Sequence, residues 1–234
     1  MHGVKRIDWN GLFKLFVMKH HPIFITGAGR SGSSLVARII SMSGGCFTGY
    51  MNGMYENWRL KKFLRNIPLS LEKHPPYPEV LNIPGKFKDN VLSVMTQQGY
   101  KNNRPWMFKE SLLTPTWKMW DNAFPDAQWI IVYRDPKDII NSCMKTTYMT
   151  LMKDPVILNT IGVSTPEAGW EWWIKKHKES WMEMVGSGID CKIVRPDKMA
   201  AGDYSQMKEM MEWLRLPWNE KTIETINPLI SRRK

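Results

Sequence analysis

One segment near the N-terminus constrains the fold of this chain more than any other. Residues 22–40 read PIFITGAGRSGSSLVARII, which is an apolar run, a turn rich in glycine and a stretch whose apolar residues recur at helical spacing. The pattern predicts a strand, a tight turn and a helix in direct succession. Such a unit directs backbone N–H groups and the positive end of the helix at an anion, and glycines allow a close approach to the backbone. We expect an anion-binding loop; a purely structural strand–helix connection is the alternative.

The side chains of this loop also suit an anion. Arg30 adds a cation, and Ser33 and Ser34 add two hydroxyl donors. Against the GxxxxGK[ST] pattern of P-loop NTPases, two glycines match and Ser34 takes the last position, but Ser33 stands where those enzymes need a lysine. That lysine pairs with the β- and γ-phosphates. The loop therefore suits a phosphate that is not part of a hydrolysed triphosphate. Its glycines are Gly27, Gly29 and Gly32.

The rest of the chain alternates short apolar runs with segments of helical period, which predicts an α/β fold with a mainly parallel central sheet. One long helix is expected with Thr165 as its cap, Pro166 at its first position and Gly186 past its end, and its tryptophan stripe is assigned to the core. A last helix should stop before Pro217. The predicted strands are Ile23–Thr26, Trp106–Phe108, Trp129–Tyr133 and Lys192–Val194.

A length of 234 residues predicts a single domain spanning 1–234. Residues 60–104 are rich in proline and basic, and we interpret them as a surface insertion; residues 146–164 lack periodicity and suit a loop over a site. No apolar stretch has the length of a transmembrane segment. The few cysteines favour a reduced, cytoplasmic setting, and no metal-ligand pattern occurs among cysteines and histidines. The cysteines are Cys46, Cys143 and Cys191.

A formal net charge of +11 indicates an anionic partner, such as a nucleotide, a sulfated or acidic glycan, nucleic acid or a membrane surface. Excess lysine that only keeps the surface soluble is the plainer interpretation. Charge alone does not decide between them, so the choice depends on motifs.

A second strand–helix unit lies about a hundred residues after the loop. Residues 126–145 read DAQWIIVYRDPKDIINSCMK, with Arg134 at the predicted strand end and Ser142 in the helix that follows. An arginine fork and a serine hydroxyl at this spacing can hold a second phosphate from two sides. The block alone is weak evidence, because an Arg–Asp pair at a strand end is often a structural salt bridge. Two anion sites at neighbouring strand ends are much stronger evidence.

Together these blocks resemble the sulfotransferases that use 3′-phosphoadenosine 5′-phosphosulfate (PAPS), especially the bacterial and tyrosylprotein-type branches. The first loop is similar to their RSGTS or RSGTT motif, with serine in place of the usual threonine. Lys109 is retained from their KDPRL-like run, whereas the following acid, proline and arginine are changed. Arg215 stands in place of the glycine of their LGLPW motif. The second signature resembles RDPxDxxxS at Arg134, Asp135, Pro136, Asp138 and Ser142.

The resemblance implies a three-layer α/β fold, PAPS as donor, adenosine 3′,5′-bisphosphate as product and no metal. The acceptor hydroxyl would belong to a glycan, a lipid, a small alcohol or a tyrosine, and nucleic acid is not expected as a partner. Arg134 and Ser142 would take the 3′-phosphate, and Lys109 would stabilise the leaving oxygen. The residues expected to hold the 5′-phosphosulfate are Gly29, Arg30, Ser31, Gly32, Ser33 and Ser34.

The general base is expected to be Glu56, whose segment NGMYEN is similar to a glutamate-bearing segment of bacterial sulfotransferases. We expect partial burial to raise its basicity. His74 and Glu110 are the other candidates, and a surface ion pair of Glu56 with Arg59 or Lys61 is the structural alternative.

Two other function classes fit parts of the sequence. A P-loop nucleotide kinase or NTPase shares the strand–loop–helix unit, but Ser33 and the lack of a suitably placed strand-end aspartate disfavour it. A non-enzymatic protein that binds polyanions is favoured only by the net charge.

Overall fold

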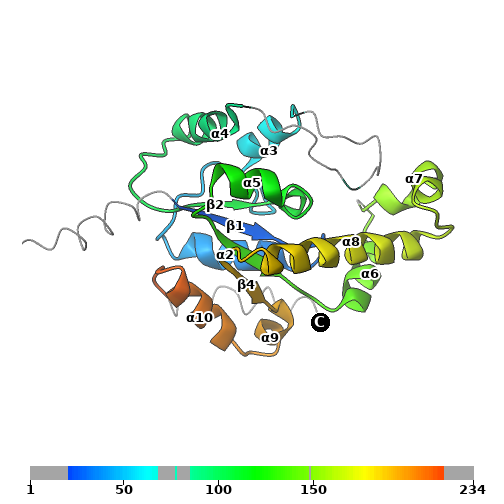
Figure 1. Cartoon of the computed structure of the whole chain (residues 1–234). Helices are drawn as coiled ribbons and strands as arrows, with labels where there is room; N and C mark the ends of the chain where they lie inside the picture. Colours follow the sequence, from blue (N-terminus) through cyan, green and yellow to red (C-terminus); the bar gives the residue numbers. More distant parts are fainter. Residues whose placement is uncertain (1–20, 68–76, 78–84, 148, 219–234) are drawn as a thin grey trace, which may run out of the picture.

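The computed structural model describes residues 21–67, 77, 85–147 and 149–218. Within these residues a central sheet is covered by helices on both faces (Figure 1). The strands are β1 (Pro22–Thr26), β2 (Trp106–Lys109), β3 (Gln128–Val132) and β4 (Cys191–Val194). The helices are α2 (Ser33–Met42), α3 (Trp58–Leu64), α4 (Phe87–Thr96), α5 (Trp117–Ala123), α6 (Pro136–Lys145), α7 (Pro155–Thr160), α8 (Pro166–Gly186), α9 (Pro196–Ala200) and α10 (Ser205–Trp213), with short 3₁₀ turns η1 (Ser111–Leu113) and η2 (Leu151–Lys153).

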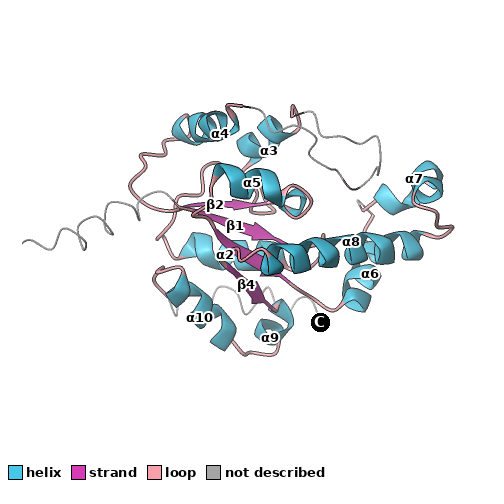
Figure 2. Cartoon of the chain, viewed as in Figure 1, coloured by secondary structure: helices cyan, strands magenta, loops and turns pink. Residues whose placement is uncertain are grey.

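The four described strands pair in the order β2–β1–β3–β4, and every pairing is parallel. All four runs predicted from the sequence are strands, so the predicted parallel α/β sheet is confirmed (Figure 2). Because the strands are parallel, their carboxyl ends share one edge of the sheet. The loop after β1 lies between the ends of β2 and β3, where open α/β sheets bind their ligands.

The two faces of the sheet bury two separate apolar clusters, because side chains alternate along each strand. Phe24 on β1 joins a cluster with α4, α5, α6 and α8, whereas its neighbours Ile23 and Ile25 pack with α2, α9 and α10 on the other face. Three layers result, as expected.

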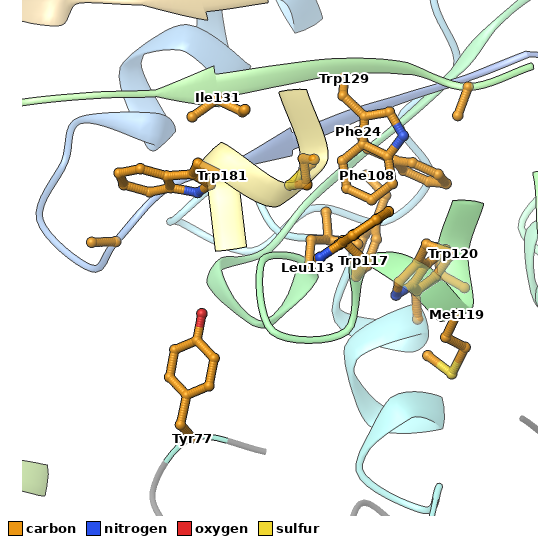
Figure 3. Packing of buried hydrophobic residues seen from close by; sticks show 14 of the residues in the cluster. Phe24, Tyr77, Phe108, Leu113, Trp117, Met119, Trp120, Trp129, Ile131 and Trp181 are labelled. Atoms are coloured by element: carbon orange, nitrogen blue, oxygen red, sulfur yellow. The ribbon is translucent and has the colours of Figure 1, made fainter. Parts of the chain in front are cut away.

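Phe24 packs against four other aromatic rings, among them Trp129, which lies beside it in Figure 3. Its ring makes edge-to-face contacts at centroid separations of 4.8–6.0 Å, a geometry that aromatic quadrupoles favour. The cluster fixes β1, and with it the start of the glycine-rich loop. The partner rings are Trp106, Trp120, Phe124 and Trp129.

Helix α8 begins as predicted but ends differently. The hydroxyl of Thr165 accepts a hydrogen bond from the backbone N–H of Ala168, and Pro166 occupies the first helical position. Gly186 is the last helical residue and not the residue past the end, which is a correction; the glycine with left-handed backbone is Gly188, at φ 76°. The tryptophan stripe of α8 is buried, as predicted.

The C-terminal helix α10 stops before Pro217, as predicted. Arg215 follows it with φ 56°, in the left-handed region that favours glycine. This is the position at which the sequence departs from the glycine of the LGLPW-like motif. The chain therefore keeps the helix-ending turn with an unfavourable residue in it.

The expectation of a surface insertion at residues 60–104 is wrong for much of the described part. Helices α3 and α4 form there, and Leu60, Val91 and Met95 are fully buried in the aromatic cluster. Helix α3 packs against α4, and Phe87 of α4 contacts Trp120 of α5, so the segment completes the core. His74 lies outside the described residues.

None of the helices among the described residues combines the length and apolar character needed to cross a membrane.

Candidate active site

The loop after β1 closes tightly onto the sheet. The backbone N–H of Ser31 donates to the carbonyl of Ala28 at 3.0 Å, and Gly32 precedes α2 with φ 98°. A Cβ on Gly27 would lie 2.6 Å from Ser31 Oγ and 2.7 Å from the carbonyl oxygen of Val132, so only glycine fits there. Ser33 and Ser34 open α2, where a helix has no internal acceptor for its first N–H groups, and the N–H of Leu35 already donates to the carbonyl oxygen of Gly32 at 2.9 Å.

Arg30 is held in the loop in a strained conformation. Its φ is 69°, a region in which non-glycine residues cost free energy. Its Nε donates a hydrogen bond of 2.9 Å to Ser142 Oγ on α6, and its carbonyl oxygen accepts one from Arg134 at 3.4 Å. The two predicted phosphate motifs thus meet at Arg30.

Local capping explains how Arg134 and Ser142 come to lie beside the loop. Asp135 caps α6 by accepting from the N–H of Lys137, and Pro136 occupies the first helical position. The chain leaves β3 through Arg134 and enters α6 with that helix beginning at the carboxyl edge of the sheet. Arg134 also pairs with Asp138 at 3.5 Å, one helical turn on.

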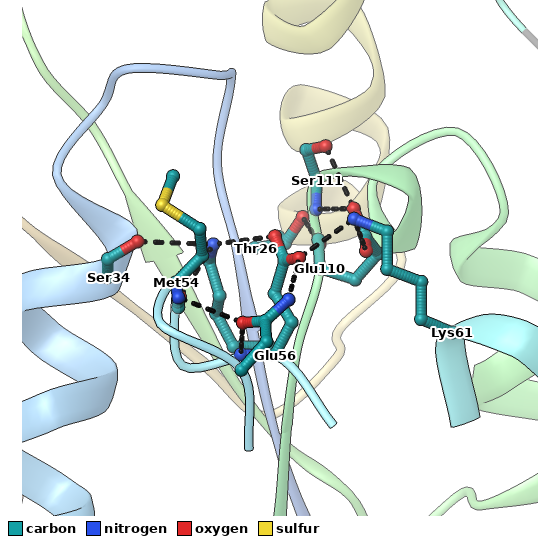
Figure 4. Close-up of polar contacts among 9 residues, drawn as sticks. Thr26, Ser34, Met54, Glu56, Lys61, Glu110 and Ser111 are labelled. Atoms are coloured by element: carbon teal, nitrogen blue, oxygen red, sulfur yellow. Dashed lines mark hydrogen bonds and ion pairs between the residues drawn. The ribbon is translucent and has the colours of Figure 1, made fainter. Parts of the chain in front are cut away.

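Lys109 links the loop to Glu56 by hydrogen bonds to Ser34 and Glu56, both of which are labelled in Figure 4. It is the last residue of β2, it is 5% exposed, and its ammonium donates to Ser34 Oγ at 3.3 Å and to Glu56 Oε1 at 3.1 Å. A third hydrogen bond goes to the carbonyl oxygen of Met54 at 3.4 Å. The structure therefore brings the predicted leaving-group cation and the predicted base together.

Glu56 is buried and not part of a surface ion pair. Its side chain accepts from Lys61 at 2.8 Å and from the Asn52 amide at 3.1 Å, in addition to Lys109. The predicted partner Lys61 is correct, but the residue is 8% exposed. Lys61 also lies 3.0 Å from Glu110.

The expectation that burial raises the basicity of Glu56 is wrong for this arrangement. Burial by itself raises the pKa of Glu56, but the attraction of Lys109 and the hydrogen bonds from Lys61 and Asn52 together hold that pKa below its ordinary value. The carboxylate is therefore ionised and ready to accept a proton, but it is a weaker base than a free glutamate while both ammonium groups contact it.

Two predicted residues, Ser31 and Gly29, are closely surrounded by other parts of the chain. Ser31 is fully buried and its N–H belongs to the turn, so it shapes the loop. Gly29 lies under Met149, whose methyl group would be 3.0 Å from an added Cβ. Met149 thus places this part of the chain beside the loop, but the expectation of an irregular loop at 146–164 is wrong for much of its described part, because η2 and α7 form there.

The structure describes no group of three or more histidine, cysteine, aspartate or glutamate residues arranged to hold a metal ion, within the residues that it covers. The basic residues Arg232, Arg233 and Lys234 lie outside those residues.

The sequence pattern did not single out Lys61 as a site residue. It treated this lysine only as an exposed partner of Glu56. A signal was present, because Lys61 directly follows the buried Leu60 on a short helix. Its meaning depends on the contacts of Lys61 with Glu56 and Glu110, which only the folded chain brings together.

Comparison with known proteins agrees with this geometry. The model of the Sulfotransferase family matches residues 22–220, whereas a search of curated protein sequences gave no match. Among solved structures, sulfotransferase STF9 from Mycobacterium avium superposes with a TM-score of 0.53 at 12% identity, over 97% of this chain and 73% of that chain.

Two sulfotransferase domains of biosynthetic enzymes share the fold as well. The domain from the curacin biosynthetic pathway gives a TM-score of 0.55 at 13% identity, and the domain from the olefin synthase of Synechococcus PCC 7002 gives 0.54 at 14%. Each match covers 87% of this chain and 77% of the other. The family match includes the glycine-rich loop, Lys109 and the Arg134–Ser142 segment, and the chain belongs to the Sulfotransferase family.

Proposed function

We propose that this protein transfers the sulfuryl group of PAPS to an acceptor hydroxyl and releases adenosine 3′,5′-bisphosphate. The observation that carries the proposal is the junction at Arg30, which hydrogen-bonds Ser142 through its side chain and Arg134 through its carbonyl oxygen. One nucleotide with phosphates at both its 5′ and 3′ positions accounts for two adjoining anion sites. An ordinary nucleoside triphosphate carries a hydroxyl at the 3′ position and no phosphate there.

The loop suits the 5′-phosphosulfate group by its donors and by its shape. Ser33 and Ser34 begin α2 and present N–H groups and hydroxyls. At position 27 the loop has no room for any side chain, so glycine is required there. Arg134 and Ser142 take the 3′-phosphate in this proposal, and charge-assisted hydrogen bonds from the guanidinium supply much of its affinity.

Sulfuryl transfer needs positioning and charge stabilisation more than covalent chemistry by the protein. PAPS supplies an activated sulfuryl group. Glu56 takes the proton from the acceptor hydroxyl as its oxygen bonds to sulfur, and Lys109 with Arg30 stabilises the negative charge that develops on the departing phosphate oxygen as its bond to sulfur breaks. The proton ends on the Glu56 carboxylate and the bonding pair ends on the phosphate.

Nucleotide phosphoryl transfer is the alternative with the same loop. Ser33 in the lysine position removes one of its main charge neutralisers, and the described residues contain no metal-holding cluster. A non-enzymatic polyanion-binding protein would use the net charge without the two ordered anion sites.

Incubation with ³⁵S-labelled PAPS and a panel of glycan, lipid, phenol and alcohol acceptors tests the proposal, with and without EDTA. Labelled product that persists in EDTA is the expected result. Magnesium-dependent ATP hydrolysis without sulfuryl transfer would favour the NTPase alternative, and binding to heparin without affinity for PAPS would favour the polyanion-binding alternative.

A further inference from the structure

Four buried or half-buried charges alternate in sign beside the glycine-rich loop. They run Lys109, Glu56, Lys61 and Glu110, with separations of 3.1, 2.8 and 3.0 Å between successive partners (Figure 4). The first two belong to the proposed reaction. Among the described residues, the side chains of Lys61 and Glu110 bind each other, Glu56 and Ser111 rather than the loop, so their role needs a separate explanation.

Glu110 is fixed at the edge of the sheet. Its backbone N–H donates to Ile25 at 3.1 Å, and its Oε1 accepts from the N–H of Ser111 at 2.9 Å and from the Ser111 hydroxyl at 3.1 Å. The residue is 3% exposed. Its other oxygen faces Lys61. The carboxylate is therefore a rigid anchor for an ammonium group.

The backbone of Lys61 is equally well fixed. Asn57 caps α3 by accepting from the N–H of Leu60, and its amide donates to the carbonyl oxygen of Thr48. The N–H of Lys61 donates to the Asn57 carbonyl at 2.9 Å. Burial opposes the charge of Lys61, but Glu110 and Glu56 together raise its pKa above the usual value, so the side chain stays an ammonium.

We propose that Lys61, anchored by Glu110, is a positioning residue that holds the Glu56 carboxylate toward Lys109 and sets how readily it takes a proton. This inference rests on the proposed function, in which Glu56 is the base. Lys61 fixes one oxygen of Glu56 while Lys109 holds the other, so the carboxylate stays in place when the Lys109 ammonium turns toward charge in the loop.

The arrangement gives Lys61 and Glu110 opposite effects on Glu56. The groups that face this carboxylate are Lys109 from the end of β2, Lys61 from α3 and the Asn52 amide from the preceding loop, with Glu110 beyond Lys61. Burial raises the pKa of Glu56 and Lys61 lowers it. Removing the Lys61 charge therefore lets the effect of burial dominate, and the pKa of Glu56 rises. Removing the Glu110 charge takes away a nearby anion and leaves Lys61 to Glu56 alone, so the pKa of Glu56 falls.

Direct titration of Glu56 tests this without an acceptor. The full-length protein is labelled with ¹³C at its glutamate carboxyl carbons, and the Glu56 signal is assigned by its loss in Glu56→Gln. We expect its titration midpoint to move to higher pH in Lys61→Met, to lower pH in Glu110→Gln and to stay near the wild-type value in Lys61→Arg. Opposite shifts from the two partners are not produced by a general loss of structure.

Unchanged midpoints, or shifts in the same direction in Lys61→Met and Glu110→Gln, would overturn the inference. If Lys61→Met does not fold, the near-isosteric Glu110→Gln and the charge-conserving Lys61→Arg decide the outcome through the same titration. Calorimetry with adenosine 3′,5′-bisphosphate on the same samples separates the two proposals, because the absence of binding contradicts the proposed function whereas the titration reports on Lys61 alone.

Discussion

The Nε atom of Arg30 donates a hydrogen bond of 2.9 Å to the hydroxyl of Ser142, a residue 112 positions further along the chain. This contact joins the loop after β1 to the helix after β3 at the carboxyl edge of the sheet. Because both residues belong to segments that carry anion-binding features, one ligand with two anionic groups can engage both.

Substitution of Arg30 separates backbone strain from ligand binding. Arg30→Gly relieves the left-handed φ of 69°, whereas Arg30→Ala keeps a Cβ in that conformation. We expect the glycine variant to be the more stable of the two by about 0.5–1 kcal/mol in urea denaturation, after the entropy cost of glycine is included. Both variants should bind adenosine 3′,5′-bisphosphate at least tenfold more weakly. Equal stability of the pair would show that residue 30 is unstrained in solution.

Glu56→Gln removes the proposed base with little change of shape. We expect turnover of ³⁵S-labelled PAPS with an accepted substrate to fall by roughly 10²–10⁴-fold, the usual contribution of general base catalysis, while bisphosphate affinity changes little. Glu171→Gln, an exposed change on α8, is the matched control and should leave turnover unaltered.

The base has been misassigned if Glu56→Gln retains wild-type turnover. Loss of turnover in His74→Ala would then assign the role to the segment between α3 and α4.

The buried His177 makes the free energy of unfolding depend on pH. Burial among the rings of Tyr77, Trp173 and Trp181 lowers the pKa of His177 to about 4. In the unfolded chain His177 takes up a proton near pH 6.5, whereas in the folded chain it stays neutral until about pH 4. Burial of the neutral ring therefore adds its full contribution to the free energy of unfolding above pH 6.5. That contribution is lost as the pH falls toward 4, by up to about 3 kcal/mol. Urea denaturation between pH 4.5 and 7.5 should show a shallower pH dependence in His177→Gln. Parallel curves for the two proteins would contradict the neutral buried state.

Much of the fold was predictable because its signals are local. The strand PIFIT, the glycine turn and α2 follow one another within 21 residues, and parallel strands place the ends of β1, β2 and β3 together wherever such a sheet forms. The same geometry made Arg30, Lys109 and Arg134 predictable as neighbours.

Packing between distant segments was not predictable in the same way. The apolar residues of α3 and α4 were not recognised as core because residues 60–104 are rich in proline. The charge state of Glu56 depends on Lys61 and Lys109, which come close to it only in the folded chain. At the end of α8, either Gly186 or Gly188 could end the helix by its sequence position, but only Gly188 has the left-handed backbone conformation that does so.

The most direct test of the account is calorimetry of Arg134→Ala with two ligands that differ only in the 3′-phosphate, adenosine 3′,5′-bisphosphate and AMP. Lys137→Ala removes a neighbouring exposed charge and serves as the control. Wild type should bind the bisphosphate much more tightly than AMP. Arg134→Ala should lose about 1.5–3 kcal/mol for the bisphosphate, the range for a hydrogen bond to a charged group, and little for AMP. Equal losses for both ligands, or equal affinities in wild type, would contradict the account.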